Sequence, residues 1–378
     1  MGFSRRADYR IPSLWILLPI SASPSILEGA SPPQLMKALV YTKPYHLVYT
    51  DFPDPVVGEH DVLIRVLACG ICGSDVHGYT GKTGRRIPPL IMGHEASGMV
   101  EEVGNQVKTF KRGNRVCFDS TVYCNRCEPC QSGYPNRCEQ RQVLGVSTHE
   151  FKRHGAFAEL VSVPWWIVSK LPDNVSFVQA ALLEPTSIGL HAANRSPISS
   201  GQTVVVIGAG TIGLCIIQAA RLKGATRIIV SDINEFRLGL AKKLGVEKTV
   251  NPSRERLERA VLNQTENNGA EVTIEAVGLA ETLHQAIEVT RIGGHVTVVG
   301  LLQKVVDIDI QAIVSKELTL CGSYANAGEF REITDLIASE KIDVEPLISK
   351  VMPLSMGQQA FDLIHKAEED LVKIVLEP

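Results

Sequence analysis

The chain has 378 residues, of which 38 are lysine or arginine and 41 are aspartate or glutamate, giving a formal net charge of −3. This length is enough for two domains that each bury a hydrophobic core. The balanced, well-mixed charges exclude the basic surface that nucleic acids and anionic membranes attract. An apolar run at residues 14–20 is too short to span a membrane. We therefore expect a small-molecule partner, no nucleic acid and no membrane.

The first 35 residues differ from the rest of the chain. Three arginines precede a short apolar stretch, and a segment rich in serine and proline follows at residues 21–33. This order loosely resembles a secretion signal, but two prolines interrupt the apolar stretch. We interpret residues 1–35 as a disordered leader or as the product of a start site assigned too far upstream. Residues 36–40 then open the fold as its first strand.

Two textures follow each other along the body of the chain. Up to about residue 171, short β-type runs such as 62–68 and 97–103 are separated by Gly, Pro and Asp, which predicts a β-rich domain. After Pro185, strands alternate with helices, which is typical of a parallel, doubly wound sheet. The strands expected there are 204–207, 228–230 and 296–299, the helices 212–222, 235–243 and 282–290, and near the C-terminus a helix at 358–366 precedes a strand at 371–376.

A glycine-rich turn follows the strand predicted at residues 204–207. In this position it is the fingerprint of a dinucleotide-binding fold. The glycines permit the tight turn and let the backbone approach a pyrophosphate, while the N-terminus of the next helix offers free N–H groups to it. The residues of the turn are Gly208, Ala209, Gly210, Thr211, Ile212 and Gly213.

An acidic residue selects between the two nicotinamide cofactors. Asp232 ends the next predicted strand, at the spacing where such a carboxylate accepts hydrogen bonds from ribose hydroxyls. Its charge would repel a 2′-phosphate, so we predict NAD rather than NADP. Arg237 lies near enough to contact the cofactor, although its position is more typical of a cation on a helix surface than of a phosphate clamp.

Five of the nine cysteines lie between positions 117 and 138, within a lobe that we place at residues 117–140. Such crowding favours thiolates around a metal and a reducing, cytoplasmic location. The spacing C-x2-C-x2-C-x7-C suits a closed structural zinc site. An iron–sulfur cluster is the rival, but the chain lacks a second cysteine-rich set and the Cys-Pro ending of ferredoxin-type runs. The four expected ligands are Cys124, Cys127, Cys130 and Cys138.

A second set of candidate ligands is dispersed along the chain. Cysteine, histidine and carboxylate from distant segments are typical of an open, catalytic zinc site, which leaves one position for water or an alcohol oxygen. Cys69 also forms a C-x-x-C pair with Cys72, but it ends a strand-like run and is better interpreted as a packed core thiol than as a redox partner. The candidate zinc ligands are Cys72, His94, Glu95 and Glu184.

Together these motifs resemble the zinc-containing medium-chain dehydrogenases of the alcohol dehydrogenase superfamily, over residues 36–378. The signature Gly-His-Glu-Ala-Ser-Gly at 93–98 and the four-cysteine lobe carry the resemblance, and Glu-Pro-Thr at 184–186 is similar to the sorbitol and sugar-alcohol-phosphate dehydrogenase branch. The resemblance implies an α/β protein with a GroES-like catalytic domain and a Rossmann domain. It also implies homodimers or homotetramers. The implied divisions are 36–185 (catalytic), 186–324 (NAD-binding) and 325–378 (return to the catalytic domain).

The resemblance also assigns roles to residues. Cys72 and His94 would bind zinc directly, Glu95 directly or intermittently, and Glu184 directly or through water. The other implied roles concern Ser74, which takes the alcohol proton and passes it through the nicotinamide ribose toward His77, and Asp75, which orients His94. Simple loop capping is the alternative for Ser74 and Asp75.

We therefore expect a secondary alcohol of a polyol, polyol phosphate or sugar derivative to be oxidised to a ketone. L-Threonine or a sugar acid is the alternative substrate. An inactive NAD-binding relative would require damaged zinc ligands, which are present here. Ser323-Tyr324 stands where sorbitol dehydrogenases carry Arg-Tyr, so sorbitol itself is in doubt. Basic residues at 149–154 could bind a phosphorylated or acidic sugar, or form a surface loop, and Trp165 and Trp166 could line the cleft or pack.

Overall fold

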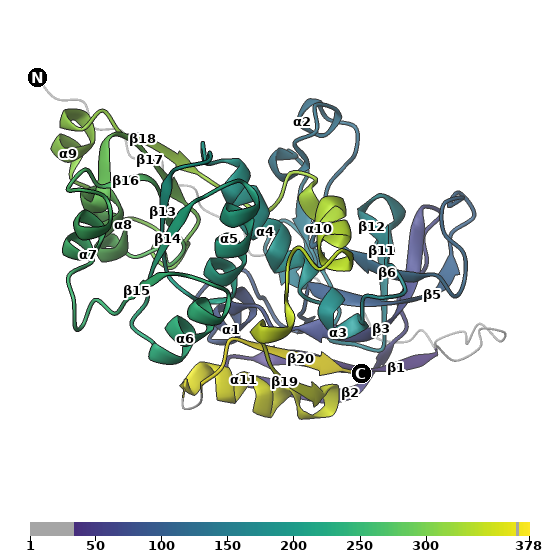
Figure 1. Cartoon of the computed structure of the whole chain (residues 1–378). Coiled ribbons are helices and arrows are strands. Elements are labelled where there is room, and N and C mark those ends of the chain that lie inside the picture. Colours follow the sequence, from purple (N-terminus) through teal and green to yellow (C-terminus); the bar gives the residue numbers. More distant parts are fainter. Residues whose placement is uncertain (1–33, 368–369) are drawn as a thin grey trace, which may run out of the picture. The chain divides into compact units, whose positions relative to one another are not determined.

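The computed structural model describes residues 34–367 and 370–378, and residues 35–378 form one compact unit (Figure 1). The leader that we interpreted at residues 1–35 therefore lies outside the described residues, except for positions 34 and 35. Residue 35 belongs to the first strand, β1 (Leu35–Lys43), because Leu35 pairs with Pro53 of the neighbouring strand.

A seven-stranded sheet forms around β3, in the order β12-β6-β5-β3-β20-β19, with β11 also paired to β3. Strand β20 comes from the end of the chain and runs antiparallel to β3, with Val375 opposite Gly70. Just beyond, the N–H of Ile71 donates to the carbonyl of Ile374 (2.9 Å). The end of the chain therefore lies beside the turn that leads to Cys72. The strands are β3 (Asp61–Gly70), β5 (Glu95–Val103), β6 (Arg115–Phe118), β11 (Leu160–Pro164), β12 (Val168–Lys170), β19 (Ile348–Pro353) and β20 (Lys373–Glu377).

Smaller sheets complete this β-rich part. Strand β1 pairs with two neighbours, and two short hairpin-like pairs, β7-β8 and β9-β10, lie on either side of residue 144 in the chain. The aromatic rings of Phe118, Phe157 and Phe361 are fully buried in the core that these sheets share with helix α11 (Gly357–Lys366). The strands are β2 (His46–Pro53), β4 (Leu90–Ile91), β7 (Thr121–Val122), β8 (Gln142–Val143), β9 (Val146–Ser147) and β10 (Lys152–Arg153).

Six parallel strands form the second large sheet, in the order β15-β14-β13-β16-β17-β18 (Figure 1). Every residue of the central strand β13 is buried, which is typical of a parallel strand with helices on both faces. The predicted α/β class, with a β-rich part and a doubly wound sheet, is confirmed. The strands are β13 (Thr203–Ile207), β14 (Arg227–Ser231), β15 (Lys248–Val250), β16 (Ala270–Glu275), β17 (Thr290–Val298) and β18 (Thr319–Gly322).

The helices of this sheet largely follow the expected pattern. Helix α6 has the predicted bounds, whereas β17 begins at Thr290 and not at residue 296. Gly293 and Gly294 lie inside that strand and interrupt its apolar pattern, so the sequence shows only the second half. The helices are α4 (Leu183–Asn194), α5 (Thr211–Leu222), α6 (Glu235–Lys243), α7 (Leu257–Gln264), α8 (Ala280–Val289) and α9 (Ile310–Ser315).

The remaining helices come before or after the strands of the parallel sheet in the chain. No helix in the described ranges is long and apolar enough to cross a membrane. These helices are α1 (Gly73–Tyr79), α2 (Glu128–Gln131), α3 (Phe177–Ala180), α10 (Glu329–Ala338) and α11 (Gly357–Lys366), with 3-10 turns η1 (Pro135–Arg137), η2 (Trp165–Ile167), η3 (Glu345–Leu347) and η4 (Leu354–Met356).

Candidate metal centres and cofactor site

Three of the four predicted catalytic ligands meet at one point. Ligand atoms of Cys72, His94 and Glu95 all lie within 4.8 Å of one another. Cys72 is the residue that caps the N-terminus of α1, and the N–H of Ser74 donates to its sulfur (3.5 Å). Gly93 turns the chain into β5 with a φ of 90°, and a Cβ there would lie 2.8 Å from the ring of Phe157. Only glycine fits that turn, which brings the next two residues to the cysteine.

Glu184 lies at the start of α4 and is 4% exposed. Its Oε1 accepts a hydrogen bond from the hydroxyl of Ser120 (2.6 Å), while its Oε2 is buried without a partner. Glu184 is not part of the close three-residue cluster, but its charge interacts with those of His94 and Glu95. Burial raises the pKa of Glu184 to about 7, against the opposing charge of His94. The carboxylate therefore lacks a sufficient cation within the protein itself.

Asp75 and Arg86 form a buried ion pair next to His94. Asp75 is fully buried, and its Oδ1 accepts from Arg86 Nη2 (3.1 Å) and lies 3.5 Å from His94 Nδ1. Its Oδ2 accepts from the backbone N–H of Cys72 (3.3 Å). Burial raises the pKa of Asp75, but the charges of His94 and Arg86 outweigh burial and hold that pKa below its ordinary range. The position of Asp75 beside His94 is the one expected from the sequence, whereas no motif marks Arg86.

A second buried cation contacts Glu95. Lys373, on β20, is 2% exposed and donates from Nζ to Glu95 Oε2 (2.6 Å) and to the carbonyl of Ile71 (2.9 Å). The other oxygen of Glu95, Oε1, is buried without a hydrogen-bond partner. Lys373 stands in an ordinary strand sequence, so nothing in the sequence marks it as part of the site.

The charges around this cluster test whether it suits a metal. With Cys72 as a thiolate and His94 as the neutral imidazole that binds a metal, the cluster and its surroundings contain four acidic groups, whereas the buried side chains that stay positive are Arg86 and Lys373. Two negative charges remain, and a divalent cation would neutralise them. Thiolate, imidazole and carboxylate are also the ligands that zinc prefers. The residues therefore fit a zinc ion. The acidic groups are Cys72, Asp75, Glu95 and Glu184.

The four cysteines predicted for the structural zinc also come together. Their sulfur atoms lie within 4.8 Å of one another, none is in a disulfide, and Cys127 and Cys130 are 3.4 Å apart. Backbone N–H groups of Arg126 and Cys127 help lower the pKa of Cys124 to about 6, whereas burial and neighbouring thiols raise the pKa of Cys130 to about 12. Four such close thiols cannot all ionise unless a cation lies between them, which fits a zinc ion. The four are Cys124, Cys127, Cys130 and Cys138.

The predicted phosphate loop connects β13 to α5. Gly208 has a φ of 99°, and Gly213 packs so closely that a Cβ would lie 1.8 Å from the carbonyl oxygen of Gly208. Gly210 caps the N-terminus of α5, and a Cβ there would meet nothing within 4 Å. The open space at Gly210 is where a pyrophosphate could approach the backbone. The intervening residues are Ala209, Thr211 and Ile212.

Asp232 is linked to this loop. Its Oδ2 accepts from the N–H of Ala209 (2.6 Å), and its Oδ1 accepts from the N–H of Asn234 (2.8 Å). Asp232 therefore fixes the loop by accepting from its backbone. Arg237, on the first turn of α6, is half buried rather than exposed, and its Nε has no hydrogen-bond partner.

Ser74 and His77 lie three positions apart on α1 and are both exposed. Residues at this spacing share a helix face. Cys69 is fully buried, which confirms its interpretation as a core thiol. Trp166 packs against the core of the β-rich part and donates from Nε1 to the carbonyl of Tyr123 (2.9 Å), so packing describes it well.

The basic segment 149–154 is largely used in local structure. His154 Nδ1 accepts from the N–H of Ile91 (3.1 Å), and burial together with Lys152 lowers the pKa of His154. Arg153 donates to Gln142 (3.2 Å). His154 and Arg153 are therefore engaged in local hydrogen bonds and partly buried, whereas Lys152 is exposed.

Tyr324 contacts the cysteine-rich lobe. Asn136 donates to its backbone carbonyl (2.9 Å), and the guanidinium of Arg141 lies 4.4 Å from the centre of its ring. The Nη1 of Arg141 is buried without a hydrogen-bond partner.

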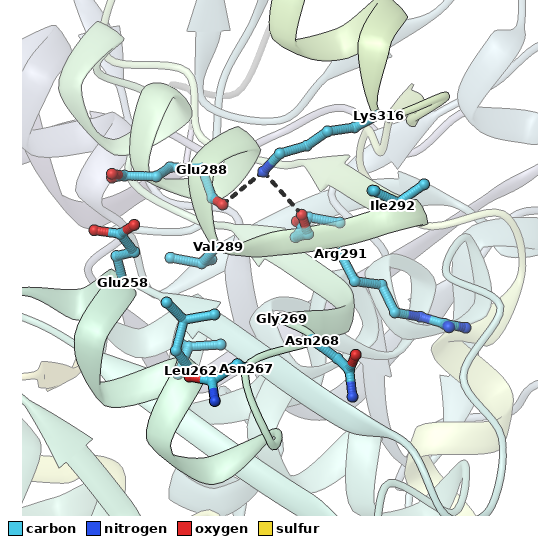
Figure 2. A pocket seen from close by; sticks show the side chains of 12 residues that line it. Glu258, Leu262, Asn267, Asn268, Gly269, Glu288, Val289, Arg291, Ile292 and Lys316 are labelled. Atoms are coloured by element: carbon cyan, nitrogen blue, oxygen red, sulfur yellow. Dashed lines mark hydrogen bonds between the residues drawn. The ribbon is translucent and has the colours of Figure 1, made fainter.

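A separate cavity of about 230 Å³ opens in the part of the chain with the parallel sheet (Figure 2). Lys316 reaches toward it and donates to the carbonyls of Glu288 (2.7 Å) and Thr290 (3.1 Å), at the end of α8. None of the predicted metal or cofactor residues lines this cavity. The lysine caps a helix end there, and because the predicted metal and cofactor residues lie elsewhere, the cavity is not the candidate active site.

Comparison with known proteins defines the class. The alcohol dehydrogenase GroES-like domain family matches residues 58–173, and the zinc-binding dehydrogenase family matches residues 211–339. Sorbitol dehydrogenase of Bacillus subtilis (strain 168) is 33% identical over 350 residues, 92% of this chain and 98% of that protein. L-Idonate 5-dehydrogenase of Vitis vinifera is 35% identical over 317 residues, 82% of this chain and 86% of that protein.

A solved structure gives the same result. A zinc-binding dehydrogenase from Sinorhizobium meliloti 1021, bound to NADP, has a TM-score of 0.84 and 33% identity, and the match covers 91% of this chain and 100% of that chain. The chain belongs to the zinc-containing medium-chain dehydrogenases of the alcohol dehydrogenase superfamily, in the group of polyol and sugar-alcohol dehydrogenases. It is an NAD(P)-dependent enzyme that acts on CH–OH donors.

Proposed function

We propose that the enzyme oxidises a secondary alcohol of a polyol, polyol phosphate or related sugar derivative to a ketone, with NAD as the hydride acceptor. The observation that carries this proposal is the cluster of Cys72, His94 and Glu95, whose charge balance and free carboxylate oxygen suit an open zinc site. When bound there, zinc acts as a Lewis acid that lowers the pKa of the substrate hydroxyl. NAD, when bound, would supply the hydride acceptor for the alcohol carbon, and the substrate hydroxyl would also have to lose a proton.

Residues of α1 would accept and transfer that proton. Ser74 follows the ligand Cys72 by two positions and is exposed, so it can accept the proton from the substrate hydroxyl. His77 shares its helix face and is also exposed, so it can receive a proton through the nicotinamide ribose and release it to solvent. Asp75, fully buried beside His94, would fix the orientation of that imidazole.

NAD is the cofactor that we propose, within the NAD(P) dependence of the family. Asp232 presents a carboxylate at the end of β14, where it would accept from the ribose hydroxyls and repel a 2′-phosphate. The relative from S. meliloti is bound to NADP, so titration of this chain with NAD and with NADP tests the preference.

A sugar acid is the second candidate substrate. One relative, of 35% identity, is an L-idonate 5-dehydrogenase, and the unpartnered Nη1 of Arg141 beside Tyr324 offers a positive group that could attract a carboxylate or a phosphate. An inactive relative is disfavoured, because all the candidate ligands are present and three of them lie together.

The test is a screen of polyols, polyol phosphates, aldonates and L-threonine, followed by NADH absorbance. We expect turnover with polyols or their derivatives, and loss of both turnover and one zinc per chain in Cys72→Ala, with NAD binding retained. Turnover that survives without the catalytic zinc would overturn the proposal.

We further propose the domain division 36–185, 186–324 and 325–378, and a homo-oligomer. Strand β18 is the edge of the parallel sheet, and exposed apolar side chains are frequent in β18 and in the stretch of chain that leads to it. Of the eighteen large apolar side chains that are exposed in the described residues, eight lie within residues 292–320. We call these the apolar edge: Ile292, Leu301, Leu302, Val305, Ile308, Ile310, Val314 and Leu320.

A further inference from the structure

Lys373 occupies an unusual position for a lysine. It is the only lysine among the buried residues of the described chain, at 2% exposure. A buried ammonium is costly unless it is paired, and here it is paired on two sides. Its Nζ donates to Glu95 Oε2 (2.6 Å) and to the carbonyl of Ile71 (2.9 Å), the residue before Cys72. Lys373 thus joins both segments that supply the close ligands.

The backbone leaves room for this contact. Lys373 begins β20, which pairs with the end of β3. At Gly70, the last residue of β3, a Cβ would lie 2.4 Å from Glu95 Oε2 and 3.4 Å from Cδ of Lys373. Any larger residue at position 70 would collide with the carboxylate. The ion pair therefore depends on a glycine in β3 and on the C-terminal strand.

The pair divides the two oxygens of Glu95 between different partners. Oε2 faces the ammonium, whereas Oε1 is buried without a hydrogen bond, and a carboxylate oxygen of Glu95 lies within 4.8 Å of the ligand atoms of Cys72 and His94. A carboxylate that shares its charge with an ammonium donates less strongly to a metal, because part of its negative charge is already compensated.

We infer that Lys373 is a positioning residue that restrains Glu95 at the catalytic zinc, keeping it a weak and exchangeable ligand so that the substrate oxygen can compete for the metal. This inference rests on the proposed function, since it requires zinc at Cys72, His94 and Glu95. Without the ammonium, both oxygens of Glu95 would be free to bind zinc, and the site would hold the metal more tightly but activate the alcohol less.

The experiment replaces zinc with cobalt(II), whose visible absorption reports coordination geometry. The spectrum of Cys72→Ala, which keeps the four-cysteine site, is subtracted so that the difference describes the catalytic site. In Lys373→Met we expect a weaker difference band, as coordination number rises, and slower zinc release to a chelator. We also expect kcat to fall about 10- to 100-fold, the range for residues that orient metal ligands.

Three variants separate charge from packing. Lys373→Arg keeps the charge and should retain the wild-type band, and adding Glu95→Gln to Lys373→Met should reverse the slow release. If Lys373→Met fails to fold, Lys373→Gln replaces it, because its amide can still donate to Ile71. Lys248→Met is the matched control, because Lys248 pairs with Glu255 (2.7 Å) in the part of the chain with the parallel sheet; its cobalt band should not change.

An unchanged band in Lys373→Met, or faster zinc release, would overturn the inference. It would then show that the lysine only stabilises the fold or the metal. A wild-type enzyme with no catalytic-site band would instead overturn the proposed function itself, so the two failures are distinguishable.

Discussion

Asp232 has two expected partners, the phosphate loop and the ribose of NAD, and its replacement should affect both. Its Oδ2 accepts from the N–H of Ala209 in the phosphate loop, and the proposed function has it accept from the ribose hydroxyls of NAD as well. Asp232→Ala should therefore raise the Kd for NAD about 10- to 100-fold, since hydrogen bonds to charged groups contribute about 1.5–3 kcal/mol. The Kd for NADP should change much less, because a repulsion is removed at the same time. Fluorescence titration with both cofactors measures this.

The control is Asp232→Asn, which keeps an oxygen for Ala209 but removes the charge. In Asp232→Asn the Kd values for NAD and NADP should lie closer together than in the wild type. The Kd for NAD should rise less than it does in Asp232→Ala. Equal weakening of both cofactors in Asp232→Ala would show that the residue only supports the loop, and the NAD preference would then need another source.

His154 links pH to stability. Burial and Lys152 lower its pKa, so the folded protein takes up a proton at lower pH than the unfolded chain does. Its contribution is fully present above the unfolded value of about 6.5 and is lost as pH falls through the folded pKa. His154→Asn can still accept from Ile91, and it should lose less Tm than wild type between pH 7.5 and 5.5. Thermal unfolding at both pH values tests this, and an equal loss in both proteins would contradict it.

At the scale of elements, the β13–α5 turn offers a matched pair of glycine substitutions. A Cβ at Gly213 would lie 1.8 Å from a carbonyl oxygen, whereas a Cβ at Gly210 meets nothing within 4 Å. Gly213→Ala should therefore lower the Tm, because the helix must move away from the strand. Gly210→Ala should leave the Tm nearly unchanged and raise the KM for NAD, because its methyl group occupies the approach of the pyrophosphate.

Calorimetry of the two variants, with NAD kinetics alongside, separates packing from binding. Equal Tm values for the two variants would mean that the turn adapts to a side chain at Gly213. An unchanged KM in Gly210→Ala would mean that the pyrophosphate does not approach this part of the backbone.

The elements differ in how much of them the sequence predicts. The phosphate loop and the four-cysteine lobe are local, because every residue that they need lies within a short stretch of chain. Lys373 and Glu95 are 278 positions apart, and Ser120 and Glu184 are 64 apart, so no local pattern connects them. Glycines interrupt β17, which hides half of that strand. Local chemistry was therefore predictable, whereas the buried cations that balance it required the tertiary structure.

For the whole molecule, the apolar edge around β18 raises the question of what covers it. Monomeric proteins rarely leave a large contiguous apolar patch exposed, and an edge strand with free N–H and C=O groups can pair with another chain. A second copy of the same chain is the occupant that we propose, because a two-fold axis lets one patch cover itself. Light scattering after gel filtration should then give two or four times the mass of one chain.

A charge placed on the apolar edge should break this assembly. Val314 is 69% exposed, and Val314→Asp would bury an unpaired carboxylate at the contact. We expect the variant to run at a smaller mass and to dissociate further on dilution. Val56 is 89% exposed and lies outside the edge, so Val56→Asp, the same change on a free surface, should keep the wild-type mass.

The edge belongs to the sheet that carries the phosphate loop, so dissociation of the copies should also lower the Tm. Added NAD binds only the folded chain and should therefore restore part of the lost Tm. A monomeric wild type, or equal masses for the two variants, would exclude this edge as the contact between copies.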